Sequence, residues 1–186
     1  MSKRDDILQA TLKLVIEGGF QSLTIKTILK EAKAGYGTLY NHFENKDDLI
    51  LVLYTDLRKK ISHVVLKSFD ENKDTHSKFN HFVSKYLDYC IDNIDEMNFI
   101  EQFSYFYADV AVIVGLDDDG FYKALYELID EGQNANIIKK CKKEIIIQQL
   151  NGSITSLAKG LRTGKYEMTK KDKEDFLQIS WDAIKV

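Results

Sequence analysis

The absence of proline is the feature that most constrains this chain. None of its 186 residues is proline and only 10 are glycine, so few positions force the backbone to leave a helix. Apolar residues recur every three or four positions along almost the whole sequence, which is the spacing of helices with one buried face. No segment shows a convincing alternation of apolar and polar residues. The sequence therefore predicts an all-α protein of about nine helices.

Apolar stripes and capping residues divide the chain into segments. The first helix begins at Ser2, which with Asp5 has the pattern of a capping box, and ends at Gly18–Gly19. Further helices are expected at about 25–32, 36–43, 46–69, 76–93, 97–114, 121–132, 142–163 and 171–184. We expect one domain over residues 1–61 and another over residues 62–186, with the long helix from about residue 46 shared between them.

Charge and cysteine content exclude several classes of protein. The chain has 26 Lys and Arg against 29 Asp and Glu, a net charge of −3, which argues against bulk coating of nucleic acid but allows a local basic face. Cys90 and Cys141 belong to no metal-binding motif, so we expect no disulfide, no metal and a reducing cytoplasm. No apolar run approaches the roughly 18 residues that span a bilayer. We therefore expect no membrane association and no cofactor.

The richest segment is a helix-turn-helix pattern over residues 24–43. Leu39 and Phe43, four residues apart, are expected to hold its second helix on the core. Short polar groups opposite such apolar anchors suit a helix that enters the major groove of DNA. The polar face carries Gly37, Thr38, Tyr40, Asn41 and His42.

Two positions beside this helix pair suit phosphate groups. Lys46 falls in the first turn of the next helix, where its ammonium and the free N–H groups can hold a phosphate. Lys26 and the N–H groups after Thr24 can do the same on the other side. A helical hairpin that touches no DNA has the same pattern, so geometry alone leaves both interpretations open.

The segment from Arg4 to Leu53 resembles the DNA-binding region of the TetR (tetracycline-repressor-like) family of bacterial regulators. The matches to its most specific motif are Ala32, Gly37, Thr38, Leu39, Tyr40, His42, Phe43, Lys46 and Leu49. The resemblance implies an N-terminal three-helix DNA-binding domain and a C-terminal helical domain that binds an effector and dimerises. It also implies that Thr24 and Lys46 position phosphates, and that the groove or its rim is faced by Tyr36, Gly37, Thr38, Tyr40, Asn41 and His42.

The turn between the two short helices departs from the family pattern. Lys33 stands where the family usually has glycine, and Ala34 and Gly35 replace the usual valine and serine. We expect Gly35 to take the left-handed position of the turn instead. The missing serine hydroxyl leaves one phosphate or cap contact unassigned.

Aromatic residues crowd the middle of the chain. Most are expected to be core, because an aromatic stripe at helical spacing usually packs inside. The resemblance implies an effector pocket among these helices, and we expect it to be lined by Tyr86, Tyr89, Phe103, Phe106, Tyr107 and Tyr122. An apolar or aromatic small molecule is the expected effector. A cation received by Glu101 or Asp109 is the alternative.

Small residues mark the penultimate helix. Gly152, Ser156 and Gly160 recur every fourth position on one face, which lets another helix approach closely. The last helix offers apolar side chains at Phe176, Ile179 and Ala183. These two helices resemble the four-helix dimer interface of the family and predict a homodimer. A contact within one chain is the alternative.

Catalysis finds little support in the sequence. His63, His76 and His81 are scattered, and no metalloprotease, hydrolase or phosphate-loop motif occurs. We predict a dimeric, ligand-responsive regulator that binds double-stranded operator DNA as a repressor and is not an enzyme. The alternative is a helical module that binds a small molecule or a protein but no DNA.

Overall fold

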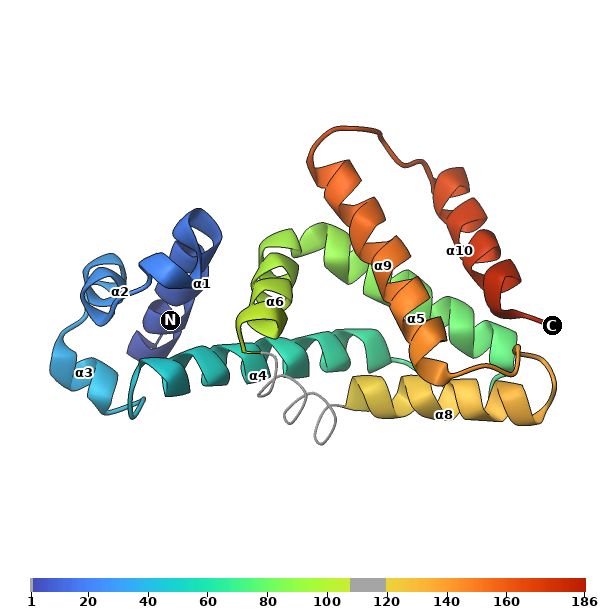
Figure 1. Ribbon diagram of the computed structural model, residues 1–186, viewed down its shortest axis with the longest axis horizontal. Coiled ribbons are helices and arrows are strands. Elements are labelled where there is room, and N and C mark those ends of the chain that lie inside the picture. Colours follow the sequence, from blue (N-terminus) through green and yellow to red (C-terminus); the bar gives the residue numbers. More distant parts are fainter. Residues whose placement is uncertain (1, 108–119) are drawn as a thin grey trace. The chain divides into compact units, whose positions relative to one another are not determined.

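The computed structural model describes residues 2–107 and 120–186, and helices dominate both ranges (Figure 1). Their bounds are α1 (Lys3–Ser22), α2 (Ile25–Ala32), α3 (Tyr36–Tyr40), α4 (Lys46–Leu66), α5 (Thr75–Asp92), α6 (Ile94–Phe106), α8 (Gly120–Asn134), α9 (Lys143–Arg162) and α10 (Lys170–Ile184). Within these ranges the only strand-like pairing is an isolated bridge between Ile138 and Lys185. None of the described helices is long and apolar enough to cross a membrane. The predicted all-α fold is confirmed.

Helix boundaries lie close to those expected from the sequence. The ends of α5, α9 and α10 agree with the prediction within one residue, whereas α3 and α4 each end three residues early. Helix α6 begins at Ile94 rather than near Met97. Its expected continuation to Val114, and the expected break over residues 115–119, lie outside the described residues.

Local capping explains where the first two helices begin. Ser2 Oγ accepts a hydrogen bond from the N–H of Asp5 at 3.1 Å, and the Asp5 carboxylate accepts one from the N–H of Ser2 at 3.0 Å. Thr24 and Thr27 form the same reciprocal pair at the start of α2. The expected stop at Gly18–Gly19 is a kink: Gly19 has φ 71°, and helical turns resume as far as Ser22.

The turn between α2 and α3 differs from the expected one. Lys33 itself takes the left-handed conformation, with φ 48° and ψ 50°, whereas Gly35 has φ −94°. The expectation that Gly35 would take the left-handed position is wrong. The reason lies in the end of α2, because the N–H groups of Lys33 and Ala34 both reach back toward its last carbonyl groups, and this closure fixes the backbone at Lys33.

The chain divides into two compact units. The described part of the first is residues 2–59 and 95–107, and that of the second is residues 60–94 and 120–186. The chain leaves the first unit within α4, two residues before the boundary expected after residue 61. Most of α6 therefore groups with the helix-turn-helix, although the sequence assigned it to the C-terminal domain.

The core of the first unit joins α1, α2, α3, the start of α4 and α6. Aromatic rings fill its α6 side. Tyr54 of α4 stacks on Phe103 of α6 with ring centroids 4.0 Å apart. Phe20 of α1 lies against Phe99 and Phe103, with ring centroids 5.4 Å and 6.5 Å away. These contacts attach α6 to the helices that carry the candidate DNA interface.

In the second unit α5 is the central helix, and α8, α9 and α10 all pack against it. Phe79 of α5 contacts Trp181 of α10, and Phe82 of α5 contacts Phe121 of α8, with ring centroids 5.2 Å and 4.7 Å apart. An ion pair between Lys173 and Asp88, 2.6 Å long, adds a polar contact between α10 and α5. Helices α8, α9 and α10 thus each cover part of the surface of α5.

The left-handed backbone at Lys33 generates a stability prediction. A residue with a Cβ atom is strained at φ 48°, and glycine is not. We expect Lys33→Gly to raise the free energy of unfolding by about 0.5–1 kcal/mol, measured by urea denaturation. The matched control is Lys30→Gly within α2, which we expect to lower it by about 1 kcal/mol. A loss of stability in Lys33→Gly would contradict the prediction.

Candidate DNA interface and effector cavity

Helix α3 presents the predicted groove-facing residues on an open surface. Leu39 and Phe43, which are 0% and 2% exposed, anchor the helix to the core. Tyr36 and Tyr40 on the other side are 57% and 54% exposed. Nothing lies within 4 Å of the position that a Cβ atom would take at Gly37. Of the other predicted residues of this face, Asn41 and His42 are exposed and Thr38 is half-buried.

The structure brings the predicted phosphate-binding residues together at the start of α2. The Lys46 ammonium donates a hydrogen bond to the carbonyl oxygen of Leu23, 3.3 Å away, directly before the cap residue Thr24. Thr24 and Lys26 are both exposed there. An ammonium has three donors, so Lys46 keeps two for a phosphate while its bond to Leu23 fixes its position.

Two further lysines, Lys30 in α2 and Lys33 directly after it, were missed by sequence analysis. Lys30 and Lys33 are exposed, and within the described residues neither has an ion pair, as is true of Lys26. The acidic residue of α2, Glu31, pairs instead with Lys13 of α1 at 2.6 Å. The spacing of Lys26, Lys30 and Lys33 by four and three residues was the available signal.

The acidic residues in the first turn of α4 are held by neighbouring groups. Tyr107 donates a hydrogen bond to the Asp47 carboxylate at 3.2 Å, and the Asp48 carboxylate accepts one from the N–H of Glu44 at 2.9 Å. Burial, followed by the charge of Asp47, raises the pKa of the Tyr107 hydroxyl, which keeps it protonated as the donor. Both carboxylates beside Lys46 thus accept hydrogen bonds from neighbouring groups and form no ion pair with Lys46 among the described residues.

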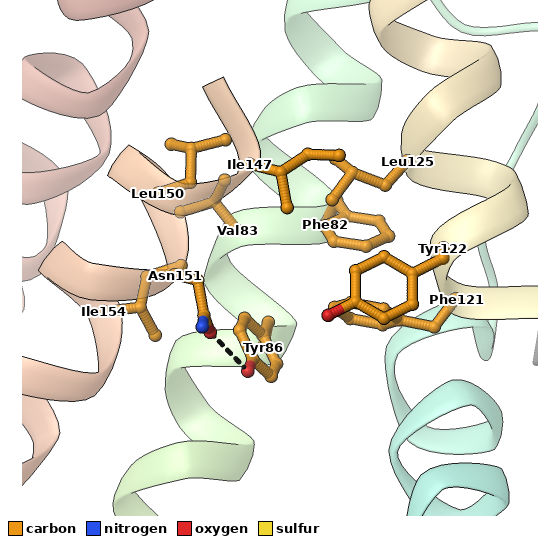
Figure 2. A pocket seen from close by; sticks show the side chains of 10 residues that line it. All are labelled: Phe82, Val83, Tyr86, Phe121, Tyr122, Leu125, Ile147, Leu150, Asn151 and Ile154. Carbon is orange, nitrogen blue, oxygen red and sulfur yellow. Dashed lines mark hydrogen bonds between the residues drawn. The ribbon is translucent and has the colours of Figure 1, made fainter. Parts of the chain in front are cut away.

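A cavity lies between α5, α8 and α9 in the second unit (Figure 2). It is lined by Phe82, Val83, Tyr86, Phe121, Tyr122, Leu125, Ile147, Leu150, Asn151 and Ile154. Tyr86 donates a hydrogen bond to the side-chain oxygen of Asn151 at 2.9 Å. Eight of these ten residues are buried, so little open space remains between them.

The six predicted effector residues are divided between the two units. Only Tyr86 and Tyr122 line the cavity. Tyr89 is buried in the same unit with the Lys60 ammonium 5.6 Å from its ring centroid. The other three, Phe103, Phe106 and Tyr107, surround Phe20 in the first unit. The contribution of α9 was missed, although the spacing of its apolar residues Ile147, Leu150 and Ile154 was visible in the sequence.

The alternative cation-binding face and this cavity belong to different units. Glu101 and Tyr105 belong to α6 in the first unit, and both are exposed. Asp109 lies outside the described residues.

Cys90 of α5 is unreactive. Burial raises the pKa of its thiol to about 12, so the thiol stays protonated.

The predicted dimer residues differ in what covers them. Gly152 and Ser156 are exposed on α9, but Gly160 is buried beneath the Tyr166 ring of the same chain. On α10, Ile179 is 68% exposed, Ala183 is exposed and Phe176 is half-buried. The open stripe of α9 also includes Ile145, which is 59% exposed. Gly160 therefore contacts its own chain, while the other positions offer apolar surface.

The fold and the α3 face together define the class of helix-turn-helix DNA-binding regulators. Residues 7–53 match the family model for bacterial regulatory proteins of the tetR family. Residues 54–186 match the model for a tetracyclin repressor-like C-terminal domain. Because these two matches cover nearly the whole sequence, the chain belongs to the TetR family. Both models describe parts of regulators, and neither describes an enzyme domain.

Individual relatives are distant. The chain is 27% identical over 164 residues to a helix-turn-helix transcriptional regulator of Staphylococcus aureus, covering 83% of this chain and 80% of that protein. It is 22% identical to the nicotine-responsive transcriptional repressor HdnoR of Paenarthrobacter nicotinovorans, but over 55% of this chain and only 52% of that repressor. A TetR-family regulator of Marinobacter aquaeolei has the same fold, with a TM-score of 0.90 at 22% identity over 98% of this chain and 95% of that one.

The position of Lys46 generates a prediction for DNA binding. We expect Lys46→Ala to weaken binding to every DNA sequence and to reduce the salt dependence by about one unit of slope, since one phosphate contact is lost. Fluorescence anisotropy over a series of salt concentrations measures both. Lys59→Ala, which removes an exposed charge from the same helix, is the control and should change neither.

Base-reading residues should behave differently. Thr38→Ala and Asn41→Ala are expected to change sequence preference more than overall affinity, because these side chains face base edges in the proposed docking. If Lys46→Ala leaves both affinity and salt slope unchanged, this docking of α3 is wrong.

Proposed function

We propose that the chain is a transcriptional repressor that binds a near-palindromic operator as a homodimer and is released by a small molecule. The observation that carries the proposal is the open α3 face, anchored by Leu39 and Phe43, with the ammonium of Lys46 from α4 held beside the start of α2. Two such faces on a two-fold dimer would read half-sites about 34–36 Å apart, or a multiple of that spacing. Such a repressor acts in the cytoplasm, where bacterial DNA lies.

A mobility-shift assay with DNA from beside the chain's own gene tests this proposal. A sequence-specific complex that unlabelled target DNA removes, and unrelated DNA does not, is the expected result. Absence of any such complex with operator-length fragments, from a folded protein, would favour the alternative of a helical module that binds a small molecule or protein only.

The release mechanism that we propose passes through α4. This helix carries the Lys46 end in the first unit and continues into the second unit as far as Leu66. A ligand in the cavity of the second unit would favour a conformation in which α4 moves Lys46 away from its phosphate. Support comes from the continuity of α4 and from the HdnoR repressor, whose name describes a response to nicotine.

Coupling between the two sites has a reciprocal consequence. A coupling free energy of about 1–3 kcal/mol changes operator affinity roughly 5–150-fold, and operator DNA must weaken ligand binding by the same factor. Calorimetric titration of a cavity ligand into the protein, with and without operator, measures this factor. Equal ligand affinity in the two titrations would show that ligand binding in the cavity is not coupled to DNA binding.

The exposed stripe of α9 generates a prediction for assembly. Gly152 and Ser156 are both exposed, and nothing lies within 4 Å of the position that a Cβ atom would take at Gly152, so we assign them to the dimer contact, where a large side chain would force two helices apart. Ser156→Trp is expected to give monomers that bind the operator poorly, measured by sedimentation velocity. Lys123→Trp, at an exposed position of α8, should stay dimeric. A monomeric parent protein would refute the assignment directly.

A further inference from the structure

The first turn of α4 is attached to the rest of the first unit through two consecutive side chains. The Lys46 ammonium donates a hydrogen bond to the carbonyl oxygen of Leu23, between α1 and α2. The Asp47 carboxylate accepts one from the hydroxyl of Tyr107, the residue that directly follows α6, at 3.2 Å. The side chain assigned to a phosphate is therefore adjacent to one that is bound by a residue 60 positions further along the chain.

The aromatic core of the unit holds the Tyr107 ring in place. The ring stacks on Phe103 of α6 with centroids 5.0 Å apart and planes tilted by 18°, and it meets Phe20 of α1 edge-on with centroids 5.6 Å apart. The Tyr107 N–H also donates a hydrogen bond to the carbonyl oxygen of Phe103 at 2.8 Å. A ring fixed in this way has little rotamer freedom left to lose when its hydroxyl binds Asp47, so the bond forms at a low cost in entropy.

The hydroxyl and the carboxylate suit each other as donor and acceptor. A hydrogen bond to a charged acceptor contributes more than one between two neutral groups. Asp47 is exposed, so without a donor its side chain would sample several orientations beside Lys46. Its negative charge could then approach the Lys46 ammonium and compete with a phosphate for it. The Tyr107 hydroxyl thus restrains both the first turn of α4 and the carboxylate that follows Lys46.

We propose that Tyr107 is a positioning residue for DNA binding, whose hydroxyl holds Asp47 and through it the Lys46 ammonium that contacts a phosphate. The proposal deepens the proposed function and rests on it, because Lys46 has this role only in a DNA-binding protein. Tyr107 itself contacts no DNA and acts through the first turn of α4. It thus has a role other than lining an effector pocket, which the sequence predicts for it.

Hydrogen exchange of the full chain without DNA tests the anchoring of α4. Tyr107→Phe removes the hydroxyl and keeps the ring, so we expect the amides of residues 48–51 to exchange about three- to tenfold faster, as the loss of one hydrogen bond predicts. The matched control is Tyr105→Phe, which removes a hydroxyl from α6 at a residue that is 82% exposed, and it should leave these amides unchanged. Unchanged exchange in Tyr107→Phe, or an equal increase in the control, would contradict the proposal.

DNA binding tests the effect on Lys46. Fluorescence anisotropy with a mixed-sequence duplex of about 30 base pairs, over a series of salt concentrations, is suitable because phosphate contacts need no particular base sequence. We expect Tyr107→Phe to weaken binding about three- to tenfold and to lower the salt slope. Tyr105→Phe should bind this duplex like the parent protein.

Double variants separate positioning from general stability. In a Lys46→Ala background, Tyr107→Phe should no longer change the affinity or the salt slope, because the contact that it positions is absent. In an Asp47→Ala background it should likewise have no further effect, because the hydroxyl has lost its acceptor. A loss of DNA affinity that persists undiminished in either background would show that Tyr107 does not act through Asp47 and Lys46, and would overturn the proposal.

These measurements also distinguish the proposal from the proposed function. A parent protein that binds no DNA would overturn both. A parent protein that binds DNA, together with a Tyr107→Phe variant that binds it equally well, would reject only the role of Tyr107 and leave the proposed function unaffected.

Discussion

The candidate DNA interface depends on the burial of two side chains. Helix α3 has only five residues, far fewer than the roughly 12–15 that an isolated helix needs to be even marginally stable in water. Leu39 and Phe43 supply what the backbone cannot, because their burial fixes α3 against the first unit and determines which face stays open. Leu39 and Phe43, four residues apart, point to the core, so most of the polar residues between and before them stay exposed.

Capping pairs could be predicted from the sequence, whereas the conformation of the turn after α2 and the residue that covers Gly160 could not. The caps at Ser2 and Thr24 involve groups three residues apart, so their pattern is visible in the sequence. The left-handed residue of the turn was misassigned to Gly35, because a preference for glycine is only a tendency and the closing bonds of α2 fix Lys33 instead. The sequence predicts Gly160 as a dimer contact, but the ring of Tyr166, six residues further on, covers it.

The aromatic residues show the same limit at larger scale. Periodicity indicates that Tyr86 and Phe103 are buried, but it carries no information about which residues surround them. One lines the cavity of the second unit, and the other stacks on Tyr54 in the first. The family resemblance could indicate that helices of the C-terminal domain hold an effector, yet only the packing of α9 on α5 identifies Asn151 as the polar group of that cavity.

An acidic chain can still present a face that binds DNA, because the charge of that face matters more than the net charge. The net charge is −3, and the two carboxylates nearest Lys46 keep their charge while they accept hydrogen bonds, Asp47 from Tyr107 and Asp48 from the backbone of Glu44. Glu31 is paired with Lys13, and within the described residues the exposed lysines at 26, 30 and 33 form no ion pair. Phosphates interact with charges within about a Debye length, roughly 8–10 Å, so the relevant quantity is the balance of this face. In the proposed docking, acidic residues elsewhere would limit nonspecific attraction to DNA and leave the contacts of α3 a larger share in selecting the site.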